Sequence, residues 1–252
     1  MSGHSKWSTI KHKKAAKDAK KGKIFTKLIR ELTVAARQGG GDITMNARLR
    51  VIVDKAKTSG MPKDNIERAI KKGTGELEGE SYEEVTYEGY GPGGVALLID
   101  TLTDNKTRTV MEVRHTLSRN SGNLGSTGST SFLFKLRGYF LFPKDSATED
   151  LLMEKLLDKG VEDIQATEDG DFEVTCEPSS FDTVKVAADE AGLKYQEAEV
   201  TKLPTTTVKL TGEDAAKMLK LVEVLEDLDD VQNVHANFDI SAADMAALEA
   251  AE

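Results

Sequence analysis

The apolar residues of this chain follow a helical period before residues 74–81 and a strand-like period after them. Upstream, positions such as Leu28, Ile29 and Leu32 recur at helical spacing. Downstream, short strand-like runs such as residues 85–88 and 95–102 are separated by glycine-rich turns. A chain with this change of period cannot form one continuous bundle or one continuous sheet. We therefore expect a helical unit followed by α+β units, with residues 74–81 as a hinge.

The helical unit contains three amphipathic segments. The first ends at the glycine run 39–41, and the second carries the apolar face that runs from Leu49 to Ala56. The third has Pro62 in its first turn and Gly73 as the residue just beyond its end. Three short helices with apolar faces predict one small bundle.

The remaining residues predict two α+β units, with the second inserted into the first. Residues 82–120 supply only two strands and one helix, which is too little sheet for an independent core. Residues 205–240 supply a strand–helix–strand unit that would complete this sheet. The segment between them has its own strands and two helices, and we expect a hairpin of residues 132–136 and 139–142 at its start.

The predicted fold class is α+β, with an N-terminal three-helix domain and two α+β domains of antiparallel sheets, the third domain inserted into the second. The expected boundaries are 1–78 for the helical domain, 79–130 plus 205–240 for the second domain, 131–204 for the inserted domain and 241–252 for a C-terminal helix.

Charge is distributed unevenly along the chain. The net charge of the 252 residues is −9. Residues 1–75, however, contain 19 Lys and Arg against 6 Asp and Glu, a net charge of +13, and the other 177 residues carry −22. This asymmetry indicates a polyanionic partner at the basic end, which the acidic remainder would repel. The alternative is a solvated basic surface without a partner.

The most basic segment, residues 1–23, contains almost no side chains that could form a core. We expect a mobile arm with fair helix propensity. Its lysines can neutralise phosphates, and the only tryptophan, Trp7, can stack on an unpaired base. If about six lysines engage phosphates, the logarithm of the binding constant should fall with the logarithm of the salt concentration at a slope of about −5. Alternatively, Trp7 packs back onto the bundle.

Composition disfavours membrane and secreted proteins. No apolar run approaches the roughly 20 residues that span a bilayer, and no apolar stretch follows the basic N-terminus as it does in a signal peptide. The lone cysteine, Cys176, excludes an internal disulfide and fits a reducing compartment. We expect Cys176 to be a half-buried structural residue, and the protein to be cytoplasmic without membrane contact.

The sequence contains no pattern that predicts catalysis. The four histidines lack metal-ligand spacing, and no nucleophile elbow or phosphate-binding Walker motif is present. Residues 89–94 match G-x-G-x-x-G, but a strand follows where a helix must receive a pyrophosphate. We interpret this run as a tight connection between antiparallel strands, with a partner contact or a nucleotide site as alternatives. We therefore predict no enzyme activity and no cofactor.

Two further features remain open. Residues 122–129 form a polar, glycine-rich loop whose backbone N–H groups could bind phosphate, although mobile linkers share this composition. On the preceding helix, Arg108, Glu112, His115 and Arg119 share one face by their spacing. This face is either a polar contact surface or a solvated face with internal ion pairs.

Long motifs in this chain resemble those of one known family. They are Gly3 to Trp7, Ile10 to Ala16, Lys23 to Glu31, Val34 to Arg37 with the following glycines, Tyr87 to Gly94, Leu102 to Asn105, Glu112 to His115, and Gly122 to Gly125. In sequence and order they are similar to the YebC/PmpR family from residue 3 to about residue 140. One departure is Ala47, where family members usually have proline.

The resemblance implies a three-domain protein in which the third domain is inserted into the second. It also implies a bacterial or organellar regulator of gene expression. Members are generally described as DNA-binding transcriptional regulators, and others, including mitochondrial relatives, look like ribosome-associated translation factors. Because the resemblance begins at residue 3, we expect no organellar presequence, which favours the bacterial cytoplasm.

Three hypotheses of function therefore stand. The first is a DNA-binding transcriptional regulator, although no helix-turn-helix recognition helix is identifiable. The second is a translation factor whose basic arm binds ribosomal RNA, with the ribosome as partner. The third is a small-molecule sensor, for which no cluster of pocket residues is found. The oligomeric state is left open.

The expected nucleic-acid contacts are the cations of the N-terminal domain and its aromatic residue. They are Lys6, Trp7, Lys11, His12, Lys13, Lys14, Lys17, Lys20, Lys21, Lys23, Lys27, Arg30, Arg48 and Arg50. The loops that could contact a partner contain Tyr90, Gly91, Pro92, Gly93, Gly94, Asn123 and Gly125.

Overall fold

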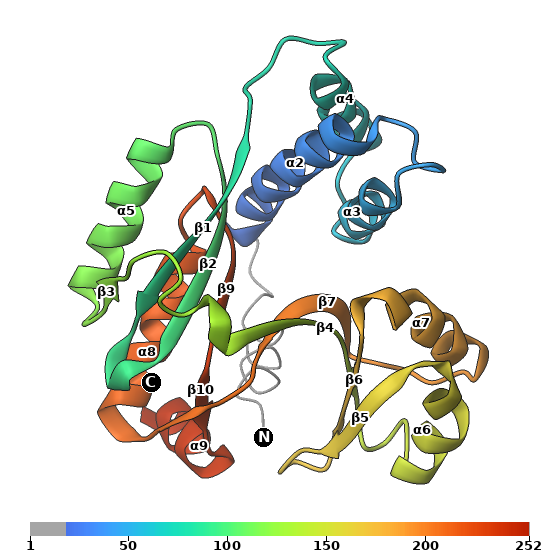
Figure 1. The fold of residues 1–252 in the computed structure, drawn as a ribbon, viewed down its shortest axis with the longest axis vertical. Helices are drawn as coiled ribbons and strands as arrows, with labels where there is room; N and C mark the ends of the chain where they lie inside the picture. The colour runs from blue at the N-terminus through green and yellow to red at the C-terminus, as the bar shows by residue number, and fades with distance from the viewer. Residues whose placement is uncertain (1–18, 252) are drawn as a thin grey trace.

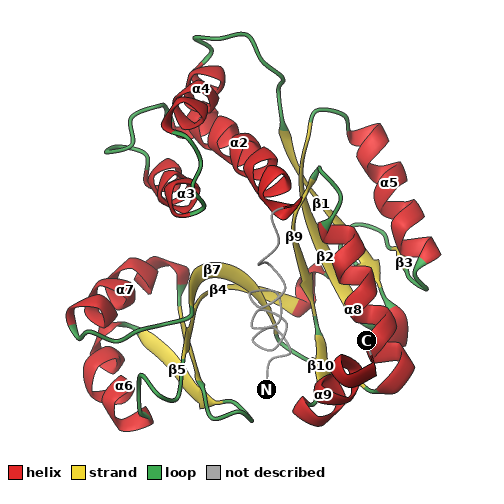
Figure 2. Cartoon of the chain, turned by 180° about the vertical axis from the view of Figure 1, so that it is seen from behind, coloured by secondary structure: helices red, strands yellow, loops and turns green. Residues whose placement is uncertain are grey.

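The computed structural model describes residues 19–251 of the chain. These residues form three groups of elements (Figures 1 and 2): a helical bundle, a sheet covered by α5 and α8, and a second sheet covered by α6 and α7. The α+β fold class predicted from the sequence is confirmed, including the insertion of the third domain into the second, because β4 to β7 lie between β3 and β8 in the chain.

The first domain is a bundle of α2 (Ala19–Gly39), α3 (Ala47–Thr58) and α4 (Lys63–Thr74). Leucine, isoleucine, valine and alanine side chains at helical spacing form its core. Asn46 caps α3, because its Oδ1 accepts a hydrogen bond from the Leu49 N–H at 3.0 Å. Its Nδ2 also donates to the carbonyl oxygens of Ala35 and Gly40, which fixes the end of α2 against the start of α3.

Three details of this domain differ from the sequence prediction. Residues 19–23 belong to α2 and not to an arm. Pro62 stands just before α4 as its N-cap, and the residue that ends α4 is Gly75, with φ of 83°. Gly73 lies inside α4, where an added Cβ would be 2.3 Å from the Thr33 carbonyl oxygen, so it is the close approach of α2 and α4 that requires glycine.

The second domain contains a sheet of strand order β3-β1-β2-β9, all antiparallel. Alternating residues of β2 face opposite sides of this sheet. Leu97 and Ile99 face the core under α5 and α8, and Ala96 and Leu98 face Phe134 on the other side. The elements are β1 (Glu83–Tyr90), β2 (Ala96–Thr103), α5 (Lys106–Arg119), β3 (Asn123–Leu124), α8 (Gly212–Glu226) and β9 (Val231–Ala236).

The second strand of the strand–helix–strand unit expected over residues 205–240 is divided in two, β9 and β10 (Phe238–Ile240). The strand is interrupted at Asn237, whose Oδ1 accepts from the Ala96 N–H at 2.7 Å and whose Nδ2 donates to the Thr206 carbonyl oxygen at 3.2 Å. Beyond it, β10 pairs in parallel with β8 (Val208–Leu210) in a separate two-stranded sheet, so of the unit 205–240 it is β9 that completes the antiparallel sheet. The C-terminal helix α9 (Ala242–Ala251) follows, and Ser241 Oγ caps it by accepting from the Asp244 N–H.

The third domain is an antiparallel sheet of order β5-β6-β4-β7 with α6 and α7 on one face. The predicted hairpin at its start is wrong, because β4 is one strand through Gly138. A Cβ at Gly138 would be 2.5 Å from the Cys176 Sγ, so this glycine marks a crowded core and not a turn. The elements are β4 (Phe134–Phe142), α6 (Glu149–Leu156), β5 (Val161–Ala166), β6 (Phe172–Cys176), α7 (Phe181–Glu190) and β7 (Glu197–Pro204).

Cys176 is fully buried in the core of the third domain. Burial raises the pKa of its thiol to about 11, which keeps the thiol protonated and unreactive at neutral pH. The structural role expected for this cysteine is in keeping with this environment. The domain boundaries at single-residue precision remain predictions.

Candidate nucleic-acid interface

The exposed surface of the helical bundle is cationic. Among residues 22–75 there are 12 Lys and Arg and 5 Asp and Glu. Two of the exposed lysines, Lys57 and Lys63, lie near acids of their own helices at 3.4 and 3.3 Å. Besides Arg37, which donates to Ser81 Oγ, four other exposed cations form no salt bridge within the described part of the chain: Arg50, Lys55, Arg68 and Lys71. These four side chains can therefore meet a polyanion without first breaking an ion pair.

The predicted contact residues do not all belong to this surface. Those at positions 6 to 17 lie outside the described residues, and Lys20 and Lys21 are in the first turn of α2. Arg48 of α3 is bound by Gln38 and by Glu84 of β1. Arg50 is exposed, with only a long contact of 3.5 Å to the Thr44 carbonyl oxygen. The assignment of each to nucleic acid remains a prediction.

Lys23, Lys27 and Arg30 face the second domain. Their spacing of four and three residues places them on one side of α2. All three reach the segment between α8 and β9: Lys23 Nζ is 3.1 Å from Asp227 Oδ1, and Lys27 Nζ donates to the Glu226 carbonyl oxygen at 2.7 Å. The last carbonyl groups of a helix lack intrahelical partners and carry partial negative charge. The C-terminal end of α8 is thus a site for the cations of α2.

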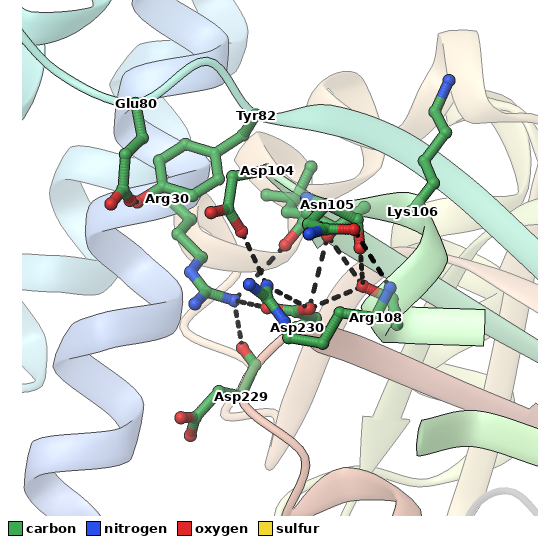
Figure 3. Close-up of polar contacts among 12 residues, drawn as sticks. Arg30, Glu80, Tyr82, Asp104, Asn105, Lys106, Arg108, Asp229 and Asp230 are labelled. Atoms are coloured by element: carbon green, nitrogen blue, oxygen red, sulfur yellow. Dashed lines mark hydrogen bonds and ion pairs between the residues drawn. The ribbon is translucent and has the colours of Figure 1, made fainter. Parts of the chain in front are cut away.

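Arg30 makes the tightest of these contacts (Figure 3). Its Nη1 donates to Asp230 Oδ1 and to the Asp229 carbonyl oxygen, both at 2.6 Å. The ring of Tyr82, from the segment that joins the first two domains, lies 5.4 Å from the guanidinium carbon. The Arg30 side chain is 13% exposed, and its Nη1 is occupied by Asp229 and Asp230.

Asp230 is the centre of this junction (Figure 3). Besides Arg30, its carboxylate accepts hydrogen bonds from Thr109 Oγ1 at 2.6 Å and Arg108 Nη2 at 2.7 Å. Burial acts to raise the pKa of Asp230, but the hydrogen bonds of Thr109 and Arg108 and the charge of Arg30 outweigh it and lower the pKa. The carboxylate therefore stays ionised, and the two domains are held by a charged, hydrogen-bonded contact.

A pocket of about 510 Å³ opens beside this junction. Six carboxylate residues line it, together with Leu228 and the two arginines that already bind Asp230. The acidic lining is Glu80, Asp104, Glu112, Asp227, Asp229 and Asp230. An excess of carboxylates repels phosphate, so this pocket is unsuited to a nucleic-acid backbone.

The glycine run after β1 is a tight connection, as the sequence predicted. Gly91 N–H donates to the Val95 carbonyl oxygen at 2.8 Å, and Gly93 has φ of 69°. A Cβ at Gly91 would be 2.6 Å from Met218 Sδ of α8, so the glycine allows the turn to pack on that helix. Pro92 is buried, Tyr90 donates to the Ser129 carbonyl oxygen, and Gly93 and Gly94 are exposed. A partner contact by this turn stays a prediction.

The loop after β3 does not present the phosphate cradle that its composition allowed. The N–H groups of Gly128, Thr130 and Ser131 donate to the carboxylate of Glu88 at 2.6 to 2.8 Å. These donors are already occupied, so for them the phosphate-binding interpretation is wrong. Burial acts to raise the pKa of Glu88, but the N–H donors outweigh it and hold the pKa at about 2. Asn123 is exposed, and Gly125 donates to the Glu88 backbone oxygen.

Between residues 19 and 251, no helix combines the length and the apolar composition that crossing a membrane requires.

Comparison with known proteins adds independent information. Residues 5–76 match the model of the TACO1/YebC protein N-terminal domain, and residues 82–238 match that of the TACO1/YebC second and third domain. A "Probable transcriptional regulatory protein" of Acidithiobacillus ferrooxidans is 59% identical over 250 residues, which cover 99% of each chain. One from Geobacter sulfurreducens is 57% identical over 248 residues, covering 98% of this chain and all of the relative.

A solved structure gives the same result for the fold. The conserved hypothetical protein Aq1575 of Aquifex aeolicus is similar with a TM-score of 0.78 and 47% sequence identity, covering 89% of this chain and 92% of that one. The two family models together span most of the sequence, and the family resemblance inferred from the motifs is confirmed. The chain belongs to the TACO1/YebC family.

Proposed function

We propose that this protein regulates gene expression by binding nucleic acid through the cationic surface of its helical domain. The observation that carries the proposal is the separation of charge, +13 over residues 1–75 and −22 over the rest. Lysine and arginine side chains that neutralise phosphates release condensed counterions, which drives binding to any nucleic acid. The acidic second and third domains would be repelled electrostatically by the phosphates of the same polymer, so binding is confined to one side of the molecule.

The contacts of the cations support a narrower set of residues for this proposal. Lys23, Lys27 and Arg30 hold α2 against the second domain. Of the exposed cations without a salt bridge, Arg50, Lys55, Arg68 and Lys71 lie on α3 and α4, whereas Arg37 at the end of α2 donates to Ser81. The contacts at the base of α2 fix the bundle so that these two helices remain in solvent.

The names of the relatives support a transcriptional regulator, and hence duplex DNA, as the first form of this function. Helices α3 and α4 are joined by the four residues 59–62, a length found in helix-turn-helix motifs. The exposed side chains of α4 alternate in charge, with Lys63 paired to Glu67. Such a face suits contact with phosphates better than readout of bases, so we expect weak sequence preference.

The second form is a translation factor that binds ribosomal RNA. A lysine-rich segment that contains the single tryptophan favours it, because folded RNA offers unpaired bases for stacking next to phosphates. This segment, residues 1–18, lies outside the described residues.

Charge reversal on the bundle tests the proposal. The R50E/K55E variant should bind a labelled DNA duplex or ribosomal RNA at least about tenfold more weakly at low salt, with a salt slope smaller by about 2. The matched control, K217E/K220E, reverses two exposed lysines of α8 in the acidic part of the chain and should bind as the wild type does. The proposal is overturned if the wild-type protein binds neither polymer, or if the R50E/K55E variant binds with the same affinity as the wild type. Co-sedimentation with ribosomes separates the RNA form from the DNA form.

A further inference from the structure

We propose that the outer face of α5 is a second phosphate-binding surface for the same nucleic acid, an inference that rests on the proposed function. Helix α5 buries Thr109, Val113, Thr116 and Leu117 against the sheet. Its opposite side lies on the outside of the molecule (Figure 1), where Met111, Glu112, Arg114, His115, Ser118 and Arg119 are exposed. This face belongs to the second domain, which is otherwise acidic. The basic character of the helical bundle therefore does not explain the positive charge of the face.

The charge of α5 differs in sign from that of the helix beside it. Within Lys106–Arg119 there are four Lys and Arg and one acid, Glu112, a net charge of +3. Within Gly212–Glu226, which is α8, there are two lysines and four acids, a net charge of −2. Both helices cover the same face of one sheet and both expose their outer sides to solvent. Solvation requires charge of either sign, so it does not explain why α5 is positive.

The loop that follows α5 is free of acidic residues, and residues 120–134 carry no charged side chain of either sign. Residues 113–144 contain no Asp or Glu, although residues 76–252 hold 37 of them. This stretch includes the C-terminal half of α5 and the loop in which Ser121, Asn123, Ser126 and Thr127 are exposed. Glu88, the carboxylate that this loop binds, is only 7% exposed and adds no acid to the surface. A phosphate backbone would therefore find hydroxyl, amide and guanidinium groups here, with Glu112 at one edge of the face as the one exposed acid of α5.

The cations of α5 fall into two classes. Near its N-terminus, Lys106 pairs with Glu83 and Arg108 pairs with Asp104 and Asp230. Arg114 and Arg119 form no salt bridge within the described part of the chain. A cation in the last turn, such as Arg119, stabilises the helix dipole, but Arg114 in the middle of the helix gains nothing from it. Helix stability thus leaves the positive face unexplained.

Arginine fits phosphate through its planar fork of N–H donors. Arg114 and Arg119 are five residues apart, about 7.5 Å along the axis, and about 140° apart around it. They flank the exposed Ser118 and His115, so a strand lying across this part of α5 can be contacted from both sides. The occupant to which this arrangement commits is a sugar–phosphate backbone of DNA or RNA.

The test removes the two unpaired charges. The R114Q/R119Q variant should bind a labelled DNA duplex or ribosomal RNA about tenfold more weakly, with a salt slope smaller by about 1.8 on the duplex or 1.4 on single-stranded RNA. The control K217Q/K220Q, which removes the same charge from α8, should bind as the wild type does. The R114K/R119K variant retains the charge and should keep the wild-type slope. Thermal melting of each variant reports whether it is folded.

The outcomes separate this inference from the proposed function. If R50E/K55E weakens binding and R114Q/R119Q leaves both affinity and slope unchanged, the face of α5 is no interface, but the proposed function stands. If the wild type binds neither polymer, both fail. If R114Q/R119Q abolishes co-sedimentation with ribosomes but binds naked RNA and DNA normally, the face contacts a protein and the inference is overturned.

Discussion

Arg30 and Asp230, 200 residues apart in the chain, are joined by a hydrogen-bonded ion pair of 2.6 Å that holds the helical domain to the second domain. The third domain is attached in a similar way. Lys202 of β7 donates to both carboxylate oxygens of Asp100 on β2, at 2.7 and 2.8 Å. Each flanking domain therefore binds a carboxylate of the second domain through one of its cations. The second domain is the central body that positions the other two.

Replacing Asp230 by alanine should destabilise the second domain by about 3 kcal/mol, because Arg30, Arg108 and Thr109 would lose their acceptor in a buried setting. Urea denaturation monitored by circular dichroism measures this loss. Replacing Arg30 by alanine should cost less, because Arg108 and Thr109 still satisfy Asp230. Its main effect should be faster proteolysis of the segment 75–82 between the domains. Equal stability of D230A and wild type would show that the junction contributes little.

Replacing Lys202 by methionine should loosen the third domain from the second. Asp100 would keep Thr86 and His235 as partners, so we expect a stability loss of only about 1 kcal/mol. The angular freedom of the third domain should rise, and small-angle X-ray scattering should show a larger radius of gyration. The control K209M removes an exposed lysine of β8 and should leave the scattering curve unchanged.

Glu88 should make the loop after β3 sensitive to acid. Its pKa in the folded protein is about 2, below the ordinary value of 4.5, so the carboxylate stabilises the fold above pH 4.5 and this contribution disappears as the pH falls toward 2. The E88Q variant should lose about 2 kcal/mol at neutral pH, because three N–H groups exchange a charged acceptor for a neutral one. The difference between wild type and E88Q should shrink as the pH is lowered, which melting curves across this range can measure. A constant difference at all pH values would contradict this role.

Replacing Gly73 by alanine should destabilise the helical domain, although alanine favours helices by about 1 kcal/mol over glycine. The added Cβ would be 2.3 Å from the Thr33 carbonyl oxygen and 2.7 Å from Ala36 Cβ, so α2 and α4 would have to move apart. We expect a net loss of about 2 kcal/mol. The matched control is Gly22→Ala in α2, where nothing lies within 4 Å of the added Cβ and the melting temperature should stay equal or rise.

Much of the fold could be predicted from local patterns. The helices around Leu28, Ile52 and Ile66 follow from the spacing of apolar residues, because a helix repeats its faces within a few residues. The errors arose where one residue type serves two purposes. Gly138 was interpreted as part of a turn, yet it lies within β4 because the Cys176 side chain leaves no room for another. Asn237 gave no local signal that its side chain would end β9 by binding Ala96.

The candidate interface was predicted less completely than the fold. The sequence identified the cationic character of the helical domain, but it assigned Lys23, Lys27 and Arg30 to the same surface as Arg50. Their spacing along α2 was a signal that they share one side, but it does not say what that side meets. A lysine or arginine binds a phosphate and a carboxylate through the same donors, so residue type alone leaves the choice of partner open.

The sequence by itself determined most of the order of helices and strands, the segregation of charge and the family, since all three depend on neighbouring residues or on the residues in chain order. The tertiary structure decided which cations form ion pairs between domains and which stay exposed. Arg114 and Arg119 are among the exposed ones. The physical reason is that the periodicity of a helix or strand depends on residues a few positions apart. The partner of a charge such as Arg30 is Asp230, 200 residues away in the sequence, and only the folded chain brings the two together.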